Sequence, residues 1–214
     1  MRRIRTRWVA AVCFVALTAT NVKAKDREEH QVSIGAEMAF PGGDFGSRNA
    51  GTGFGASVRY EYAANEYMSL TGNVGYLSFG KKSMETGFGV NTDYTSSIIP
   101  ILIGVKYYLN GEDNGLHFGA QLGLSMLSMK YSTPAFDYQG TTIDAVSNTY
   151  KKSAFTYNIG IGYRVSHLDF EIGYYVFDYS ISTPDFSGGS ASTLMTDYTG
   201  GWTGIRVAYF LGGD

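Results

Sequence analysis

The chain of 214 residues is poor in cysteine, proline and charge. It has 1 Cys and 4 Pro, and only 17% of its residues are charged against 44% that are hydrophobic. A single Cys13 forms no internal disulfide and no Cys-ligated zinc site. The balance of charge and apolar content excludes a disordered polyampholyte, and the mean hydropathy of -0.10 excludes a bundle of membrane-spanning helices.

Residues 1–24 have the pattern of a cleaved export signal. Arginines up to Arg7 precede an apolar stretch from Trp8 to about Thr18, and the segment ends in Val22-Lys23-Ala24. We predict cleavage after Ala24, because small or apolar residues occupy the two positions that decide it. The apolar stretch is too short to cross ~30 Å of hydrocarbon as a helix. Cleavage also removes Cys13, and with it any thiol nucleophile.

Removal of this signal makes the protein acidic. The chain has 17 Lys+Arg and 19 Asp+Glu, and its formal net charge is -2. Residues 1–24 hold five of the basic residues and no acidic one, which leaves 12 basic against 19 acidic residues and a charge of -7 in residues 25–214. Because phosphate contacts need a basic surface, nucleic acid is excluded as a partner.

Residues 25–214 form one domain in which apolar and polar positions alternate with the period of a β-strand. Long and short connections also alternate, so that the long ones gather at one end. This alternation of connection lengths predicts an all-β fold rather than a Greek-key sandwich. The predicted fold is an eight-stranded antiparallel up-and-down transmembrane β-barrel with short periplasmic turns and long extracellular loops. The predicted strands centre on residues 31–40, 53–62, 68–76, 98–107, 116–126, 155–164, 168–176 and 202–211.

The composition of the two faces favours a membrane barrel. The polar face is mostly Gly, Ser, Thr and Asn, which suits a crowded lumen, whereas the apolar face carries Ile, Val and Leu, with Tyr and Phe near the strand ends. A secreted lipocalin-like barrel alternates in the same way, and aromatic residues favour strands in any sheet, so both alternatives stay open.

Charged residues of both signs occupy inward-facing positions. Buried charge is costly unless it is paired, so we predict an ion-pair network that closes the lumen. An eight-stranded barrel is just filled by its side chains, and no broad pore is expected. The predicted network consists of Glu37, Arg59, Glu61, Lys106, Arg164, Asp169, Glu171 and Arg206.

The segment around Pro100 is apolar on both faces. Pro100 lacks a backbone donor, which predicts a bulge or local irregularity in this strand. The apolar inner face also supports an alternative function, the passage of a small hydrophobic molecule through a narrow barrel.

Three runs of residues, 99–109, 116–125 and 155–164, resemble the small outer-membrane β-barrel domain family of opacity and OmpX-like proteins. The resemblance covers nearly all of the mature chain. It implies a monomer in the Gram-negative outer membrane that contacts lipid and lipopolysaccharide and is inserted by the barrel-assembly machinery. Such barrels often end on an aromatic residue, whereas residues 211–214 follow Phe210 here, so we expect an internal signal such as Tyr209-Phe210.

We expect no enzyme, cofactor or metal site. An outer-membrane lipid hydrolase, the enzymatic alternative, needs a His-activated Ser near the outer leaflet, but His30, His117 and His167 all map to the periplasmic end. The histidines lack metal-ligand spacing and are expected to be satisfied or solvated. The resembling family includes adhesins and structural barrels, which implies a surface-interaction role for the long loops. The candidate loop contacts are Phe45, Phe88, Phe136, Tyr138 and Phe186.

Overall fold

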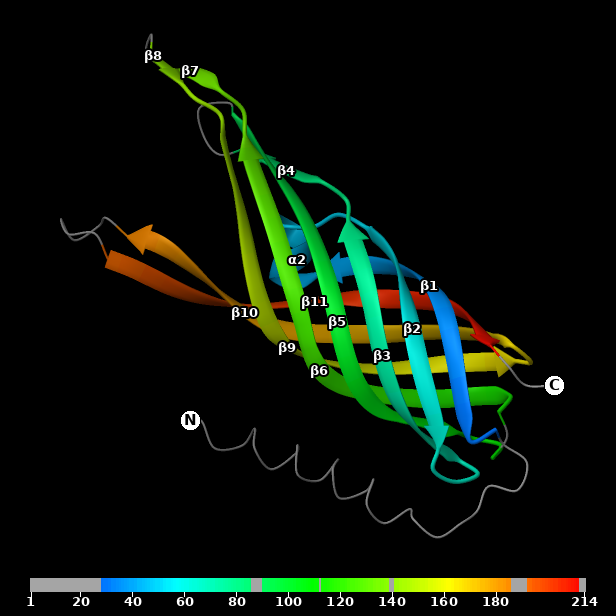
Figure 1. Ribbon diagram of the computed structural model, residues 1–214. Coiled ribbons are helices and arrows are strands. Elements are labelled where there is room, and N and C mark those ends of the chain that lie inside the picture. The colour runs from blue at the N-terminus through cyan, green and yellow to red at the C-terminus, as the bar shows by residue number, and fades with distance from the viewer. Residues whose placement is uncertain (1–27, 86–89, 112, 139–140, 186–191, 212–214) are drawn as a thin grey trace.

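The computed structural model describes residues 28–85, 90–111, 113–138, 141–185 and 192–211 (Figure 1). The predicted cleavage site at Ala24 and the loop candidates Phe88 and Phe186 lie outside these residues.

Eight antiparallel strands form a closed ring. Each strand pairs with the next one along the ring, and β1 pairs with β11, which closes it. This arrangement confirms the predicted eight-stranded up-and-down barrel. The ring consists of β1 (His30–Gly42), β2 (Gly53–Ala63), β3 (Met68–Phe79), β5 (Asn91–Tyr108), β6 (Gly115–Thr133), β9 (Val146–Val165), β10 (Leu168–Asp185) and β11 (Ser192–Leu211).

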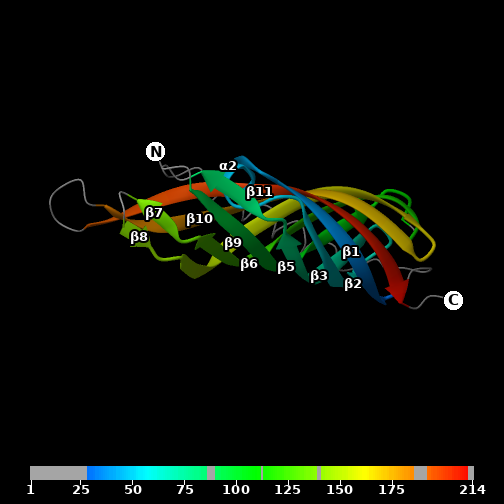
Figure 2. The same cartoon turned by 90° about the horizontal axis from the view of Figure 1, so that it is seen from above.

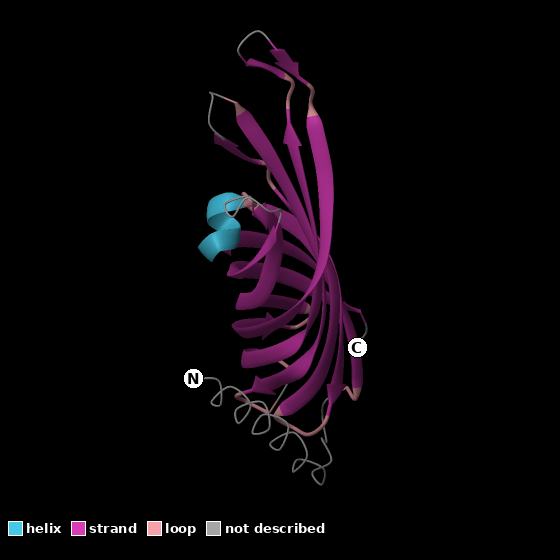
Figure 3. Ribbon diagram, turned by 90° about the vertical axis from the view of Figure 1, so that its left-hand side faces the viewer, coloured by secondary structure: helices cyan, strands magenta, loops and turns pink. Residues whose placement is uncertain are grey.

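Smaller elements lie at one end of the ring. The short helix α2 (Gly43–Arg48) follows β1 and lies beside the barrel mouth (Figure 3). The strand β4 (Lys82–Glu85) pairs with the upper part of β5, and β7 (Phe136–Tyr138) pairs with β8 (Thr141–Ile143). Among the described residues, no helix is long and apolar enough to cross a membrane.

The short connections gather at the opposite end, where β1 begins and β11 ends. The tightest of them is Ser166-His167, between β9 and β10. Ser166 has a φ of 55°, and its N–H donates a 2.6 Å hydrogen bond to Asn114 Oδ1 in the neighbouring connection. Short turns mark the periplasmic end of such barrels, so the arms described next extend from the extracellular end.

Two hairpins continue beyond the ring and diverge from each other in Figure 1, and seen from above both extend past the same end of the barrel (Figure 2). The ladder between β9 and β10 ends at Thr156↔Phe177, yet β6 and β9 stay paired up to Thr133↔Val146. The β10 and β11 strands stay paired up to Asp185↔Ser192. We call residues 128–133 with 146–151 the β6–β9 arm, and residues 178–185 with 192–199 the β10–β11 arm.

Pro100 interrupts one ladder of β5. The pairs with β3 run from Met68↔Tyr107 to Val74↔Ile101 and resume at Leu77↔Ile98. The register is the same on both sides of this gap, so no residue is inserted and there is no bulge. The local irregularity predicted from the missing proline donor is therefore present, while the ladder from β5 to β6 continues through Pro100↔Ser125.

Side chains alternate between the lipid-facing surface and the lumen. On β9 every second residue from Phe155 to Val165 is exposed and apolar or aromatic, whereas Asn158 and Arg164 are buried. At about 3.3 Å per residue and a tilt of about 40°, this stretch spans roughly 25 Å along the membrane normal, the usual height of the apolar band of a membrane barrel.

We expect the closed ring to make electrophoretic mobility depend on heating. In cold detergent the purified protein should stay compact and migrate differently from the boiled sample, because the paired ring has no free edge from which to unravel. Electrophoresis with and without boiling measures this. Identical mobility of both samples would contradict a stable closed ring.

Candidate functional site

Lys106 is the centre of the periplasmic half of the lumen. Its Nζ donates hydrogen bonds to Glu61 Oε1 at 2.6 Å and to Asp169 Oδ2 at 2.9 Å. These three side chains come from β5, β2 and β10, and each is at most 2% exposed. Tyr108 donates a 2.9 Å hydrogen bond to the second oxygen of Glu61. One buried cation thus joins three strands across the interior of the ring.

A second ion pair lies beside the first. Arg59 on β2 donates two hydrogen bonds to the Glu171 carboxylate on β10, at 2.5 and 3.0 Å. Arg206 lies 3.8 Å from Glu37 and donates a hydrogen bond to the hydroxyl of Ser57. Two-point contact between a guanidinium and a carboxylate fixes both groups in one plane.

Arg164 is held differently from the other predicted network residues. Its Nη1 donates a 2.6 Å hydrogen bond to the Gln31 side-chain oxygen, and Gln31 in turn donates to Asp113 at 2.7 Å. The guanidinium carbon also lies 3.6 Å from the ring centre of Phe210. The structure therefore brings seven of the eight predicted residues into direct ion pairs, and it connects Arg164 to a carboxylate through an amide.

His117 belongs to this network, although the sequence analysis treated it as an ordinary histidine. It is fully buried, and its Nε2 donates a 2.7 Å hydrogen bond to Asp169 Oδ1. The alternation of β6 already placed His117 on the polar face, and its register partner Tyr108 also lies inside. Its inward-facing position, together with its place near the centre of the predicted charges, was the signal that could have identified it.

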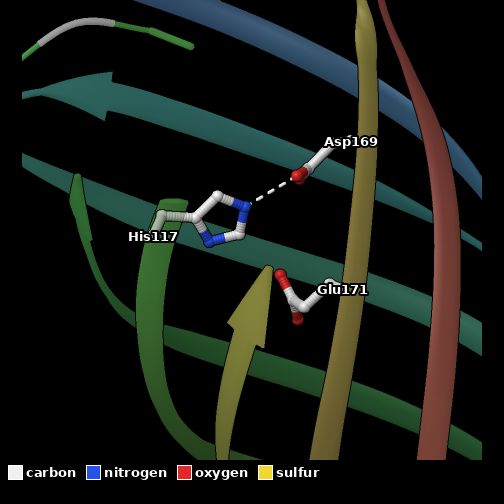
Figure 4. Close-up of side chains that lie close together, drawn as sticks. All are labelled: His117, Asp169 and Glu171. Carbon is white, nitrogen blue, oxygen red and sulfur yellow. Dashed lines mark hydrogen bonds and ion pairs between the residues drawn. The ribbon is translucent and has the colours of Figure 1, made fainter. Parts of the chain in front are cut away.

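His117, Asp169 and Glu171 offer ligand atoms within 4.8 Å of one another, the geometry of a candidate metal site (Figure 4). Each carboxylate, however, already accepts hydrogen bonds from a buried cation, Lys106 on Asp169 and Arg59 on Glu171. A divalent ion would have to displace these ammonium and guanidinium groups or lie against them. The donor set therefore fits an ion-pair network and does not fit a metal.

Little free space is left in the polar half of the lumen. The cavity there is lined by Arg59, Lys106, Gln121, Asn158 and Glu171, among others, and leaves about 10 Å³ for the centre of a water molecule. That is the space of about one water. The side chains themselves fill this part of the lumen.

The extracellular half of the lumen is filled by aromatic rings. Trp202 stacks on Tyr175 with ring centres 4.5 Å apart, and Phe177 lies 5.7 Å from the same indole. Phe45 of α2 closes the mouth by packing edge-on against Phe79 at 5.1 Å and Phe177 at 5.3 Å. We call these five residues the aromatic plug.

The position of Phe45 contradicts its predicted role as a loop contact. It was expected as an exposed loop contact, but its side chain is completely buried. Gly43 has a φ of 60°, a conformation that glycine adopts without a Cβ clash, and it turns the chain at the start of α2. The helix then carries Phe45 into the barrel mouth.

The remaining described loop candidates lie on β7. Phe136 is half-buried and pairs in register with Ile143, and Tyr138 ends the same strand. Nearer the barrel, Tyr131 and Tyr150 stack with ring centres 5.8 Å apart on the β6–β9 arm. Sequence alternation alone did not single out this tyrosine pair, because the strand continues beyond the membrane band.

Comparison with protein families matches residues 10–204 to the model described as outer membrane protein beta-barrel domain. The chain belongs to this family. As an outer-membrane barrel it resides in the outer membrane, and the predicted family and localisation are confirmed. A comparison with curated proteins finds no match.

Solved structures similar to this outer-membrane barrel share little of its sequence. The outer membrane protein OprG from Pseudomonas aeruginosa is 11% identical with a TM-score of 0.50, over 89% of this chain and 99% of OprG. The attachment invasion locus protein Ail of Yersinia pestis is 13% identical with a TM-score of 0.47, over 85% of this chain and 97% of Ail. At these identities the likeness to OprG supports the fold alone.

Proposed function

We propose that this outer-membrane barrel is a closed structural and surface-interaction protein whose extracellular arms make the contacts. The observation that carries the proposal is the combination of a filled lumen with two hairpins that extend past the ring. Ion pairs occupy the periplasmic half and the aromatic plug occupies the other. The arms are the part of the described chain that offers an extended surface outside the membrane.

The arms have the features of a recognition surface. Tyr150 and Val146 are 46% and 47% exposed, and they stand above the membrane band on β9. Among the residues that the structure describes, the edge of β9 facing β10 has no strand partner beyond Thr156. Exposed aromatic residues and an unpaired edge both favour contact with another macromolecule.

Exchange of the arms for short turns tests this proposal. A variant in which a short Gly/Ser-containing turn joins β6 to β9 just above the ring should insert and fold, because it removes only the upper pairs of β6 with β5 and leaves the buried ion pairs of the lumen unchanged. It should lose most binding of the producing cells to host cells or to matrix proteins. The measurement is the number of bound cells relative to cells with the wild-type protein.

The same exchange in the β10–β11 arm shows which arm acts, and heat-dependent mobility verifies folding of each variant. If cells with both arms removed still bind as the wild type does, an adhesive role of the arms is wrong. A purely structural role would remain, and it would be visible as altered detergent sensitivity of cells that lack the protein.

We further propose a monomeric, non-catalytic protein that is inserted by the barrel-assembly machinery through Tyr209-Phe210. Phe210 is buried at 1% exposure, whereas Tyr209 is exposed at 52% and therefore accessible from the lipid side. The alternative, passage of a small hydrophobic molecule, has the apolar inner residues Leu102 and Leu127 in its favour. These leucines belong to the same buried cluster as the aromatic plug, so this function would require the plug to move.

A further inference from the structure

Several buried side-chain atoms in the lumen have no hydrogen-bond partner among the residues that the structure describes. They include the Nε of Arg59, the Oε1 of Gln121 and the Oδ1 of Asn158. These three residues are at most 7% exposed. Buried polar groups in native proteins almost always have a partner, so a group that lacks one within the protein indicates a small bound molecule.

The same three residues line one cavity, although they come from different parts of the chain. Gln121 on β6 pairs in register with Asn158 on β9, and Arg59 reaches the cavity from β2. Gly119 also lines it and, having no side chain, leaves its space open. The cavity leaves about 10 Å³ for the centre of a water molecule, which is enough for one water and too little for an organic ligand. We call it the lumen cavity.

The other polar groups around the lumen cavity are already engaged. Lys106 donates hydrogen bonds to two carboxylates, and both oxygens of Glu171 accept hydrogen bonds from the terminal nitrogens of Arg59. Gln121 Nε2 donates a 3.1 Å hydrogen bond to Thr71 Oγ1. The groups that remain are one N–H donor, on Arg59, and two amide oxygens that can only accept.

We propose that the lumen cavity binds a single water molecule. Its oxygen accepts a hydrogen bond from Arg59 Nε, and its two hydrogens are donated to Gln121 Oε1 and Asn158 Oδ1. Three hydrogen bonds are the usual number for a buried water. A cation would lie against the N–H of a guanidinium group, and an anion would lie against two carbonyl oxygens. This set of atoms therefore selects a neutral molecule that both donates and accepts.

The bound water makes a connection that the direct contacts do not provide. The ion pair of Arg59 with Glu171 joins β2 to β10. The water joins Arg59 on β2 to Gln121 on β6 and Asn158 on β9, and β2 and β9 lie on opposite sides of the ring. It is thus part of the structure that holds the lumen closed, and its removal should lower the stability of the barrel.

The variant Gly119→Ala tests this inference by filling the lumen cavity. A Cβ at this position would meet only the Val105 carbonyl oxygen, at 3.9 Å, so the methyl group fits without a clash. If it displaces a water, three polar atoms lose their partner, and the midpoint of urea unfolding should fall by roughly 0.5–1 M. If the cavity holds no water, a methyl group that fills it should raise the midpoint instead.

Gly72→Ala is the matched control. It makes the same substitution within a strand, and a Cβ there would meet nothing within 4 Å. Gly72 pairs with the exposed residues Tyr60 and Ile103 and does not line the lumen cavity. Its unfolding midpoint should equal or slightly exceed that of the wild type. A midpoint for Gly119→Ala at or above that of Gly72→Ala would overturn the inference.

A high-resolution crystal structure of the purified barrel gives the direct test, from crystals soaked in rubidium chloride or in sodium bromide. The wild type should show one density peak about 2.7–3.2 Å from Arg59 Nε, Gln121 Oε1 and Asn158 Oδ1, without anomalous signal from either ion. The peak should be absent in Gly119→Ala. No peak in the wild type, or a peak with anomalous signal, would show that the cavity does not bind water.

Discussion

Replacement of Lys106 by methionine is expected to destabilise the barrel by about 3–5 kcal/mol, the usual cost of removing one partner from a buried ion pair. The variant keeps most of the side-chain volume but leaves the carboxylates of Glu61 and Asp169 without their shared cation in a region that is at most 2% exposed. Unfolding in urea or guanidinium, followed by tryptophan fluorescence in detergent or lipid, measures the change in free energy.

The matched control for this experiment is Lys152→Met, the same substitution at an exposed position, where we expect a change within about 0.5 kcal/mol. Adding Glu61→Gln and Asp169→Asn to Lys106→Met should restore part of the loss, because the neutral side chains no longer need a cation. Wild-type stability of Lys106→Met alone would show that the two carboxylates are not held by this lysine.

Replacement of Trp202 by alanine is expected to cost about 3–5 kcal/mol as well, and to leave the barrel closed to ions. The indole is 1% exposed and stacks on Tyr175 at an interplanar angle of 6°, so its removal opens a large cavity in the aromatic plug. Ion pairs still fill the periplasmic half. Chemical unfolding measures the loss of stability, and conductance across a planar bilayer tests the seal.

Trp202→Phe is the control, since it retains an aromatic ring and should recover a large part of the stability. If Trp202→Ala instead admits a small hydrophobic dye into the cell or produces channel steps in the bilayer, the plug is the principal barrier. Passage of small molecules would then become the better description of the function, and the periplasmic ion pairs would not form a seal.

Alternation along the strands was enough to predict the ring and the inward charges, because the period of two fixes which face each side chain occupies. Lys106 and Asp169 lie far apart in sequence, yet the alternation along their strands and the order of the strands place both side chains in the lumen. The alternation shows which face a side chain occupies but not which residue it contacts. It therefore did not distinguish Arg164, which donates a hydrogen bond to Gln31, from the residues in direct ion pairs.

The extracellular end was less predictable, for a different physical reason. Phe45 follows a strand in a Gly-rich connection, and only the path of the chain after Gly43 shows that it enters the barrel mouth. The continuation of β9 up to Val146 was missed because its side chains above the membrane are exposed on both faces. Where no face is buried, the hydrophobic pattern that reveals a strand is absent.

The position of Lys106 also links its stabilising effect to closure of the ring. Its two carboxylate partners come from β2 and β10. Both strands lie next to Lys106 at the same time only when β1 pairs with β11 and closes the ring. Pairing between segments so far apart in sequence costs loop-closure entropy before any contact can compensate for it. In a partly assembled sheet the carboxylates stay hydrated, so we expect the full stabilisation from this lysine only once the ring closes.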